Sequence, residues 1–320
     1  MMSLDRTALL NLYSKLYLTR SFEEALVSLY AGKSLPEKPM TSIGQEAVAV
    51  GATFCLREDD YVLPALRTRG AFFAKGITAK EYLFEVFRKK ESISGGRWTA
   101  HHMGDMDRGV ILGSAVVSSS LPVAAGTALS AKLRRTDQVA LAFFGDGGSS
   151  TGATHSAMNF AAALNLPIVF VCENNRYSLS TPISVQTRNE NIVDRAFGYG
   201  IEGDMVDGQD IIEVVHSVSR AIHRARRGDG PSLIEAKTYH FRGHSESHAP
   251  DDGRPGEELA KWRARDPLKL FEEYLAHAGV EADALASTRA GVDEEIREAV
   301  KAVKEAPDPS PDELDWRVYA

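Results

Sequence analysis

One acidic residue and one amide residue follow two apolar runs in the middle of the chain. Asp146 stands among glycines in FFGDGGSS (143–150), and Asn175 ends the run PIVFVCENN (167–175). If both runs are buried strands of one parallel sheet, their carboxyl ends lie at the same edge, where open α/β sheets bind their ligands. We therefore expect the two side chains to reach a single crevice.

A carboxylate and an amide oxygen form a hard-oxygen donor pair, which suits Mg²⁺ or Ca²⁺ and is poor for Zn²⁺. Two protein oxygens do not fill an octahedral shell, so such an ion typically takes further oxygens from a phosphate ligand and from water. Gly147 and Gly148 would let a phosphate approach the backbone, and the helix beginning near residues 149–152 would offer free amides and its positive end. These residues predict a metal–diphosphate site.

Each motif by itself also has a purely structural explanation. Asp-Gly is a common turn pair, and Asn-Asn is common in loops. The segment GDGG matches neither the dinucleotide fingerprint G-x-G-x-x-G nor the phosphate loop that ends in G-K-[ST]. The combination favours a functional site, because each motif closes a buried strand of the same βαβ unit.

The hydrophobic pattern predicts the elements that position these residues. QVALAFFGD (138–146) is a near-continuous apolar run, typical of a parallel strand covered on both faces. Residues 151–166 have helical spacing, so strand, helix and strand form a crossover that is right-handed by strong preference. We predict an α/β fold with a mostly parallel sheet flanked by helices. One domain would span 1–320, with an N-terminal helical arm (1–40) and a C-terminal helical tail (280–320).

Two long polar segments are predicted to be loops. Residues 91–114 are rich in Gly and His, and a structureless stretch of that length within a compact domain is usually functional or mobile. The segment GHSESHAPDDGRPGEE (243–258) is predicted to be an exposed loop.

Composition excludes several classes of protein. The formal net charge of -7 argues against nucleic acid as a partner, because phosphate backbones require a basic surface. No apolar run approaches the roughly 20 residues that span a bilayer, and the charged N-terminus is neither a signal peptide nor an anchor. The two cysteines are Cys55 and Cys172, and the strand-like surroundings of Cys172 predict a buried thiol. A cytoplasmic location fits these features.

The pattern GDG, helix, NN at this spacing resembles the thiamin diphosphate signature. The string from 143 to 182 resembles the alpha subunit of the decarboxylating component of 2-oxoacid dehydrogenase complexes, a family that includes pyruvate, branched-chain and acetoin dehydrogenases. The resemblance extends over most of the chain. Counterparts exist for SIGQEA, GGRWTAHHMG, SSSLPVAAGTALSAK, VDGQD, GPSLIEAKTYHFRGHSES and KWRARDPL.

This resemblance implies thiamin diphosphate and Mg²⁺ as cofactors and a thiamin diphosphate-binding fold. It makes Asp146 and Asn175 ligands of Mg²⁺ through their side chains, and Tyr177 a ligand through its backbone carbonyl. Gly147 and Gly148 would contact the diphosphate with their amides.

Four further positions match functional residues of the family. Arg67 matches the arginine that binds the diphosphate, a bidentate role that suits a guanidinium. Val117 matches the position whose backbone meets the aminopyrimidine ring. His102 and His244 match two active-site histidines, His244 in a loop that closes over the cofactor. Some relatives hold a monovalent cation near Ser114, Ser119 and Ser120, although helix capping explains these serines better.

The chain also departs from the family pattern. Leu66 replaces a tyrosine that precedes the diphosphate arginine, and Arg69 replaces a frequent histidine, for which its charge would compensate. Relatives usually have Glu or Gln in place of Thr151, Glu in place of Ser156, and Asp in place of His248. None of these changes touches the predicted metal ligands.

The resemblance implies a partner chain. Thiamin diphosphate chemistry needs a carboxylate against the aminopyrimidine ring, and one α/β domain already uses most of this chain. We expect a separate beta subunit to supply the pyrimidine-binding domain and its glutamate in an α₂β₂ assembly. A lipoyl-bearing acyltransferase component would accept the acyl group, and loop 240–254 would be mobile until the cofactor binds.

The leading interpretation is therefore the alpha subunit of an enzyme that oxidatively decarboxylates a 2-oxo acid. Acetoin cleavage by a sister enzyme is an alternative, although the segment GHSES is more similar to the oxo-acid branch. A third interpretation is a degenerate, non-catalytic partner subunit, which would explain Leu66, Thr151 and Ser156.

Overall fold

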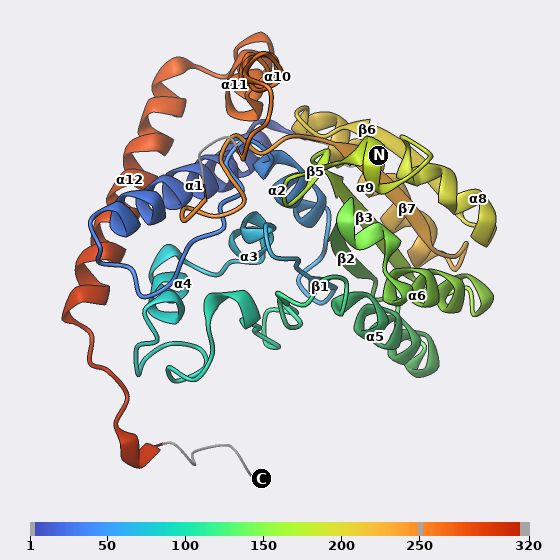
Figure 1. The fold of residues 1–320 in the computed structure, drawn as a ribbon, viewed down its shortest axis with the longest axis horizontal. Helices are drawn as coiled ribbons and strands as arrows, with labels where there is room; N and C mark the ends of the chain where they lie inside the picture. The colour runs from blue at the N-terminus through green and yellow to red at the C-terminus, as the bar shows by residue number, and fades with distance from the viewer. Residues whose placement is uncertain (1–3, 249–251, 314–320) are drawn as a thin grey trace.

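The computed structural model describes residues 4–248 and 252–313 of the chain. Its centre is a parallel five-stranded sheet in the order β1-β2-β3-β7-β6, with a separate two-stranded hairpin, β4-β5 (Figure 1). The strands are β1 (Tyr61–Leu63), β2 (Ala140–Gly145), β3 (Ile168–Asn174), β4 (Tyr177–Ser178), β5 (Thr181–Pro182), β6 (Glu202–Asp207) and β7 (Ser232–Lys237).

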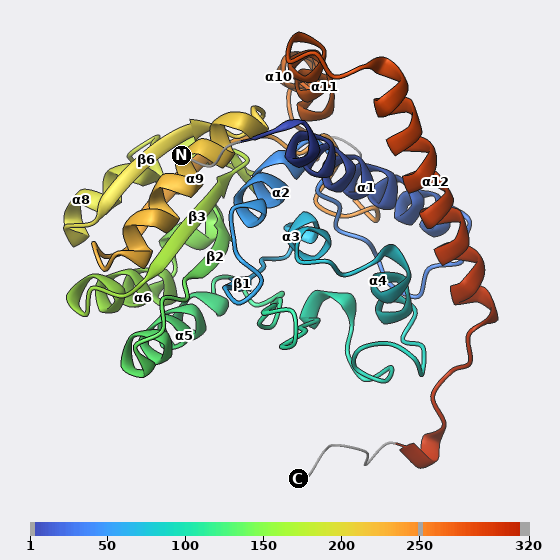
Figure 2. The same cartoon turned by 180° about the vertical axis from the view of Figure 1, so that it is seen from behind.

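Helices cover both faces of the sheet and extend beyond its β1 edge (Figures 1 and 2). The α-helices are α1 (Arg6–Ala31), α2 (Glu46–Phe54), α3 (Arg69–Ala74), α4 (Ala79–Val86), α5 (Ser120–Arg134), α6 (Gly152–Ala163), α7 (Ile183–Gln186), α8 (Arg195–Tyr199), α9 (Ile211–Arg226), α10 (Gly256–Arg263), α11 (Pro267–His277) and α12 (Ala282–Glu305). The 3₁₀ helices are η1 (Ala100–His102), η2 (Gly147–Ser150), η3 (Ile192–Asp194) and η4 (Pro311–Glu313). The predicted α/β class is confirmed.

The two central strands are buried on both faces because their side chains alternate between two hydrophobic clusters. Leu141 and Phe143 of β2 join the cluster that includes helices α1, α3, α4 and α9. Phe144 of β2 joins Phe170 and Cys172 of β3 in the cluster under α5 and α6. Double-sided burial explains why both sequences are nearly continuous apolar runs rather than alternating ones. It also confirms the predicted burial of the Cys172 thiol.

The register of β2 and β3 places the carboxyl ends of the two strands side by side. Gly145 pairs with Glu173, so Asp146 and Asn175 both emerge just beyond the paired residues at one edge of the sheet. The connection runs through α6, whose N-cap Thr151 accepts a hydrogen bond from the backbone N of Thr154. This is the predicted strand–helix–strand unit.

The terminal helices contribute to the hydrophobic core. Leu12, Tyr13 and Phe22 of α1 are completely buried, and α12 packs along α1 and α4 at the edge of the molecule (Figures 1 and 2). Within the described residues, no helix is both long and apolar enough to cross a membrane. The division into a single domain with an N-terminal arm and a C-terminal tail stays a prediction.

Two segments differ from the sequence-based expectation. Strand β6 was not predicted, because it lies at the sheet edge and is largely exposed and polar, without a continuous apolar run. The segment 243–258 was predicted to be exposed, which is wrong for part of it. Ser245 is 4% and Arg254 is 5% exposed. Arg254, near the end of the segment, donates to the carbonyl oxygens of His240 and Arg242, which lie just before its start. These hydrogen bonds hold the two ends of the segment together. Residues 249–251 of the segment lie outside the described residues.

Candidate active site

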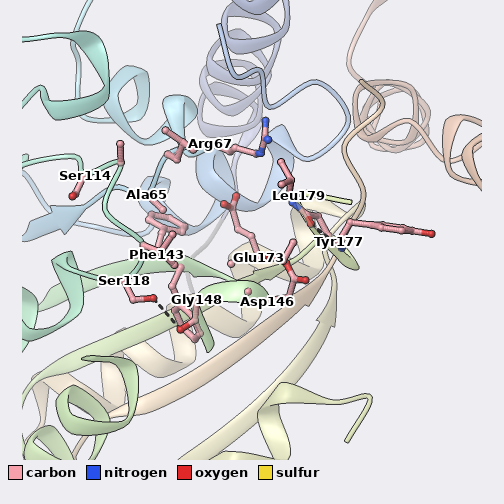
Figure 3. Close-up of a pocket in the computed structure, with 18 of the residues that line it drawn as sticks. Ala65, Arg67, Ser114, Ser118, Phe143, Asp146, Gly148, Glu173, Tyr177 and Leu179 are labelled. Atoms are coloured by element: carbon pink, nitrogen blue, oxygen red, sulfur yellow. Dashed lines mark hydrogen bonds between the residues drawn. The ribbon is translucent and has the colours of Figure 1, made fainter. Parts of the chain in front are cut away.

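A cavity opens at the carboxyl ends of β2 and β3, and most of the predicted site residues line it (Figure 3). This is where an open parallel sheet is expected to hold a ligand. The structure brings together residues from five separate stretches of the chain. The predicted residues that line the cavity are Arg67, Val117, Asp146, Gly147, Gly148, Asn175, Tyr177 and His244.

Asp146 stands where β2 ends and η2 begins, and it is only 3% exposed. The Nε2 atom of Gln186 donates a hydrogen bond of 2.8 Å to its Oδ2 atom. Burial raises the pKa of the Asp146 carboxyl, and the hydrogen bond from Gln186 opposes that rise. A cation bound at this carboxylate would replace the lost water and recover the cost of burying its charge.

Asn175 is held in one orientation by hydrogen bonds at both ends of its amide. Its Nδ2 atom donates to Oε1 of Gln45 at 3.0 Å, and its Oδ1 atom accepts from the backbone N of Tyr177 at 3.3 Å. The turn between them passes through Arg176, whose φ is 72°. The side chain of Tyr177 points away from the cavity, and its hydroxyl donates to Glu258 at 2.6 Å (Figure 3). Tyr177 therefore contributes backbone to the cavity.

The two glycines after Asp146 allow neighbouring segments to approach very closely. A Cβ atom on Gly147 would lie 2.7 Å from the Cβ of Ser178, and one on Gly148 would lie 2.5 Å from the Oγ of Ser118. The same Oγ donates to the carbonyl oxygen of Gly148 at 3.0 Å (Figure 3). Any side chain at these positions would collide with the wall of the cavity, which explains why glycine is required.

Arg67 is a buried cation on the opposite wall of the cavity from the strand ends (Figure 3). Its Nη1 atom donates to the carbonyl of Thr41 at 2.8 Å, and its Nη2 atom donates to the carbonyl of His244 at 2.6 Å. Burial lowers the pKa of Arg67 to about 10, so the guanidinium stays charged at neutral pH. It supplies a fixed positive charge to the cavity.

His244 is held as a neutral imidazole beside that charge. Its Nδ1 atom lies 3.0 Å from Nη2 of Arg67, and its backbone N donates to Asp252. Burial and the neighbouring Arg67 lower the pKa of His244 to about 4. At neutral pH its Nδ1 atom thus accepts a hydrogen bond from Arg67.

Comparison with known proteins identifies the family. Residues 14–312 match the sequence profile of the family described as dehydrogenase E1 component. The chain is 38% identical over 315 residues to 2-oxoisovalerate dehydrogenase subunit alpha of Bacillus subtilis (strain 168), covering 97% of this chain and 94% of that one. It is 36% identical over 318 residues to the alpha subunit of acetoin:2,6-dichlorophenolindophenol oxidoreductase of the same organism, covering 99% and 95%.

A third relative is the pyruvate dehydrogenase E1 component subunit alpha of Zymomonas mobilis (strain ATCC 31821 / ZM4 / CP4), 34% identical over 312 residues and covering 97% and 88%. This chain belongs to the dehydrogenase E1 component family. The family predicted from the sequence is confirmed, and with it the assignment as an alpha-type E1 chain and an oxidoreductase. The family implies thiamin diphosphate as the cofactor.

The cavity of this E1 chain fits the diphosphate end of that cofactor. Gly147 and Gly148 expose backbone where added side chains would collide, and Arg67 supplies a buried positive charge. The oxygens of Asp146 and Asn175 are hard donors of the kind that bind a divalent ion shared with phosphate. Val117, whose backbone is expected to meet the aminopyrimidine ring, lines the cavity and is 62% exposed.

His102 is the one predicted site residue that does not line the cavity. It lies in η1, and its backbone N donates to the carbonyl of Thr99 at 2.9 Å. Burial and the charge of Arg69 lower the pKa of the adjacent His101 to about 4.

The departures from the family pattern lie in different places. Leu66 lines the cavity, whereas Arg69 is 4% exposed and pairs with the buried Glu23. The charge of Arg69 is thus neutralised in the interior, away from the cavity. Ser119 precedes α5 without a side-chain capping hydrogen bond, so the capping explanation is wrong for it, and its Oγ atom lies 2.7 Å from the Oγ of Ser114.

Sequence reasoning missed three residues that shape this site. Gln45 orients Asn175, Gln186 contacts Asp146, and Glu173 lines the cavity with its Oε1 atom buried and without a hydrogen bond. Burial raises the pKa of Glu173 to about 8, so this carboxyl is mostly protonated at pH 7 and does not repel an anion. The position of Glu173 directly before Asn174 and Asn175 was the available signal, since a charge in an otherwise apolar strand is unusual.

Proposed function

We propose that this chain is the alpha subunit of a 2-oxoacid dehydrogenase whose cavity holds Mg²⁺ and the diphosphate of thiamin diphosphate. One observation carries the proposal. Two oxygen-bearing side chains from adjacent strand ends, two obligatory glycines and a buried arginine surround the same cavity. A structural role for Asp146 alone would explain none of the other residues.

The proposed metal ligands are the side chains of Asp146 and Asn175 and the backbone carbonyl of Tyr177. The hydrogen bond from Asn175 Nδ2 to Gln45 supports this assignment, because it fixes the orientation of the amide, and Oδ1 keeps a second lone pair for a cation beside its hydrogen bond from Tyr177. The outward direction of the Tyr177 ring supports a backbone role for that residue (Figure 3). Oxygen donors with partial or full negative charge are those that Mg²⁺ prefers.

The proposed diphosphate contacts are the amides of Gly147 and Gly148 and the guanidinium of Arg67. Since Arg67 donates to the carbonyl of His244, an incoming diphosphate would compete with the loop for the same donor. His244 is proposed to act next to the cofactor as a neutral imidazole, which its position beside Arg67 supports. His102 is proposed as a second active-site histidine on the resemblance alone.

Thiamin diphosphate supplies an electron sink for decarboxylation when it is bound. This chain would bind and orient it at the diphosphate end, while the backbone of Val117 would meet the aminopyrimidine ring. A partner beta subunit is proposed to supply the pyrimidine-binding domain and the glutamate in an α₂β₂ assembly. Exposed apolar side chains beside the cavity support this, since Val116, Val117 and Leu179 are 64%, 62% and 50% exposed.

A lipoyl-bearing acyltransferase component is the proposed acceptor of the acyl group. The cytoplasm is the proposed location, which the two unpaired cysteines, Cys55 and Cys172, support. The proposed fold unit is a single domain over 1–320.

The test is a calorimetric titration of thiamin diphosphate with Mg²⁺ into the purified chain assembled with its co-purifying beta subunit. Saturable, Mg²⁺-dependent binding is expected, and Asp146→Ala is expected to abolish it. Asp107→Ala, which changes an exposed loop aspartate, serves as the matched control and should bind normally. Unchanged binding in Asp146→Ala would refute the site.

Acetoin cleavage is a second candidate, because identity to the acetoin relative, 36%, is close to the 38% found for the 2-oxoisovalerate relative. A panel of 2-oxo acids and acetoin, assayed with an artificial electron acceptor on the assembled pair, separates the two. Dye reduction with a 2-oxo acid and none with acetoin is the expected result.

A further inference from the structure

Gln186 lies directly behind the carboxylate of Asp146. It is the last residue of α7, which follows the β4–β5 hairpin. Its Nε2 atom donates one hydrogen bond of 2.8 Å to Asp146 Oδ2 and a second of 2.8 Å to the carbonyl oxygen of Thr181. Both hydrogens of the amide nitrogen are therefore in use.

This pair of acceptors fixes the orientation of the Gln186 amide. Rotating the amide by half a turn would place its oxygen against two other oxygens, with no proton between them. The contact with Asp146 is consequently always that of a donor, and it engages one carboxylate oxygen, Oδ2. The other oxygen, Oδ1, makes no side-chain hydrogen bond with the described residues.

Gln186 does not itself line the cavity that Asp146 lines. It is thus a supporting residue, which contacts the carboxylate from outside the cavity. Partners of this kind orient the groups that bind a metal, and their loss typically lowers metal affinity by about 10–100-fold.

The segment from Asn175 to Gln186 connects the two strand ends of the site. It starts at Asn175 and Tyr177, turns through the β4–β5 hairpin and comes back to Asp146, which Gln186 contacts. Arg195 makes a second connection just beyond, because it donates to the carbonyl of Ser149 and to Thr187 Oγ1, the latter at 3.2 Å. The hairpin and α7 are therefore fastened to the segment that follows β2 at two points.

We propose that Gln186 is a positioning residue for the divalent ion, which sets the rotamer of Asp146 and joins the two strand-end ligands into one rigid unit. This inference rests on the proposed function, since it takes Asp146, Asn175 and Tyr177 as the metal ligands. Gln186 touches neither the ion nor the cofactor and acts through Asp146.

The test compares Gln186→Met with Gln138→Met in the chain assembled with its beta subunit. Methionine keeps the length of the side chain and removes both donors. Gln138 is the matched control, because its Nε2 atom likewise donates to a backbone carbonyl, that of Asp59, and it lies before the start of β2, at the opposite end of that strand from the cavity. Two quantities are measured: the Mg²⁺ concentration that half-saturates thiamin diphosphate binding, and the thermal unfolding midpoint without Mg²⁺.

Gln186→Met is expected to raise the half-saturating Mg²⁺ concentration by about tenfold or more, while Gln138→Met leaves it unchanged. A purely structural role would lower the unfolding midpoint without changing the Mg²⁺ requirement, and that result would overturn the inference. A second measurement replaces Mg²⁺ with Mn²⁺ in the assembled complex. Its electron paramagnetic resonance spectrum should differ between wild type and Gln186→Met, and an identical spectrum would also overturn it.

Asp146→Ala distinguishes failure of this inference from failure of the proposed function. If Asp146→Ala abolishes Mg²⁺-dependent binding and Gln186→Met does not weaken it, the metal site is correct and the role of Gln186 is wrong. If Asp146→Ala binds normally, the metal site itself is wrong, and the role of Gln186 is wrong with it.

Discussion

The cavity has two halves that are built in different ways. The strand-end half consists of Asp146, Asn175 and the two glycines, and its positions follow from the register of β2 and β3. The loop half consists of Arg67 and His244, which contact each other although 177 positions separate them in the chain. Nothing in the local sequence of either residue specifies the other.

This difference shows how each half is stabilised. Backbone hydrogen bonds between buried parallel strands fix the backbone of the strand-end half, and contacts from Gln186 and Gln45 then orient its side chains. The loop half depends on a few hydrogen bonds made by one guanidinium, which a ligand can replace. We expect the first half to be rigid and the second to respond to ligand and pH.

The largest expected effect comes from removing a strand-end ligand. Asn175→Ala deletes the amide oxygen and should weaken Mg²⁺-dependent binding of thiamin diphosphate by more than about 100-fold, beyond what loss of a supporting residue costs. Calorimetry on the assembled pair measures this. Asn165→Ala, which alters an asparagine in the turn after α6, is the control, and equal losses in both variants would contradict the assignment.

A smaller loss is expected in the loop half. Arg67→Ala removes a buried cation and its hydrogen bonds to Thr41 and His244, and should cost about 2 kcal/mol of thiamin diphosphate binding, or roughly 30-fold. Arg67→Lys keeps the charge without the fork and should recover only part of that loss. Full recovery in the lysine variant would show that charge alone matters at this position.

The glycine requirement can be tested with a matched pair of substitutions. Gly147→Ala places a Cβ 2.7 Å from the Cβ of Ser178, and should cost about 1–3 kcal/mol of folding stability as well as cofactor affinity. Gly152→Ala meets no atom within 4 Å and should be neutral. Chemical denaturation and cofactor titration of both variants measure the difference, and similar behaviour would contradict the close approach.

The smallest expected effect is a pH dependence confined to the loop half. The pKa of His244 is lowered to about 4 in the packed loop, so the released loop, with an ordinary value near 6.5, binds more protons between these limits. Packing is then complete above about pH 6.5 and weakens as pH falls toward 4. Hydrogen exchange of amides 241–248, corrected for intrinsic rates, should show faster opening at pH 5 than at pH 7.

Two variants decide whether His244 causes that change. His244→Gln should flatten the pH dependence, because the titrating group is gone. His277→Gln, which changes an exposed histidine at the end of α11, should leave it intact. Persistence of the pH dependence in His244→Gln would assign it to another group.

The sequence alone determined the α/β class, the central crossover and the strand-end half of the cavity. Long apolar runs identify strands buried on both faces, and residues that directly follow such strands must emerge at one edge of a parallel sheet. The places of Asp146 and Asn175 at the cavity were therefore predictable from position, and the resemblance to a family supplied Arg67 and His244.

Only the tertiary structure decided which loop residues reach the cavity. His102 was expected in the site and does not line this cavity, whereas Glu173, Gln45 and Gln186 were not expected and shape it. Arg69, two positions after Arg67, pairs instead with Glu23 in the interior. Loop side chains are placed by partners far away in the sequence. Loops have no register that would fix their positions in the way that strand pairing does. Local pattern therefore predicted the strand ends and could not predict the residues that loops bring to them.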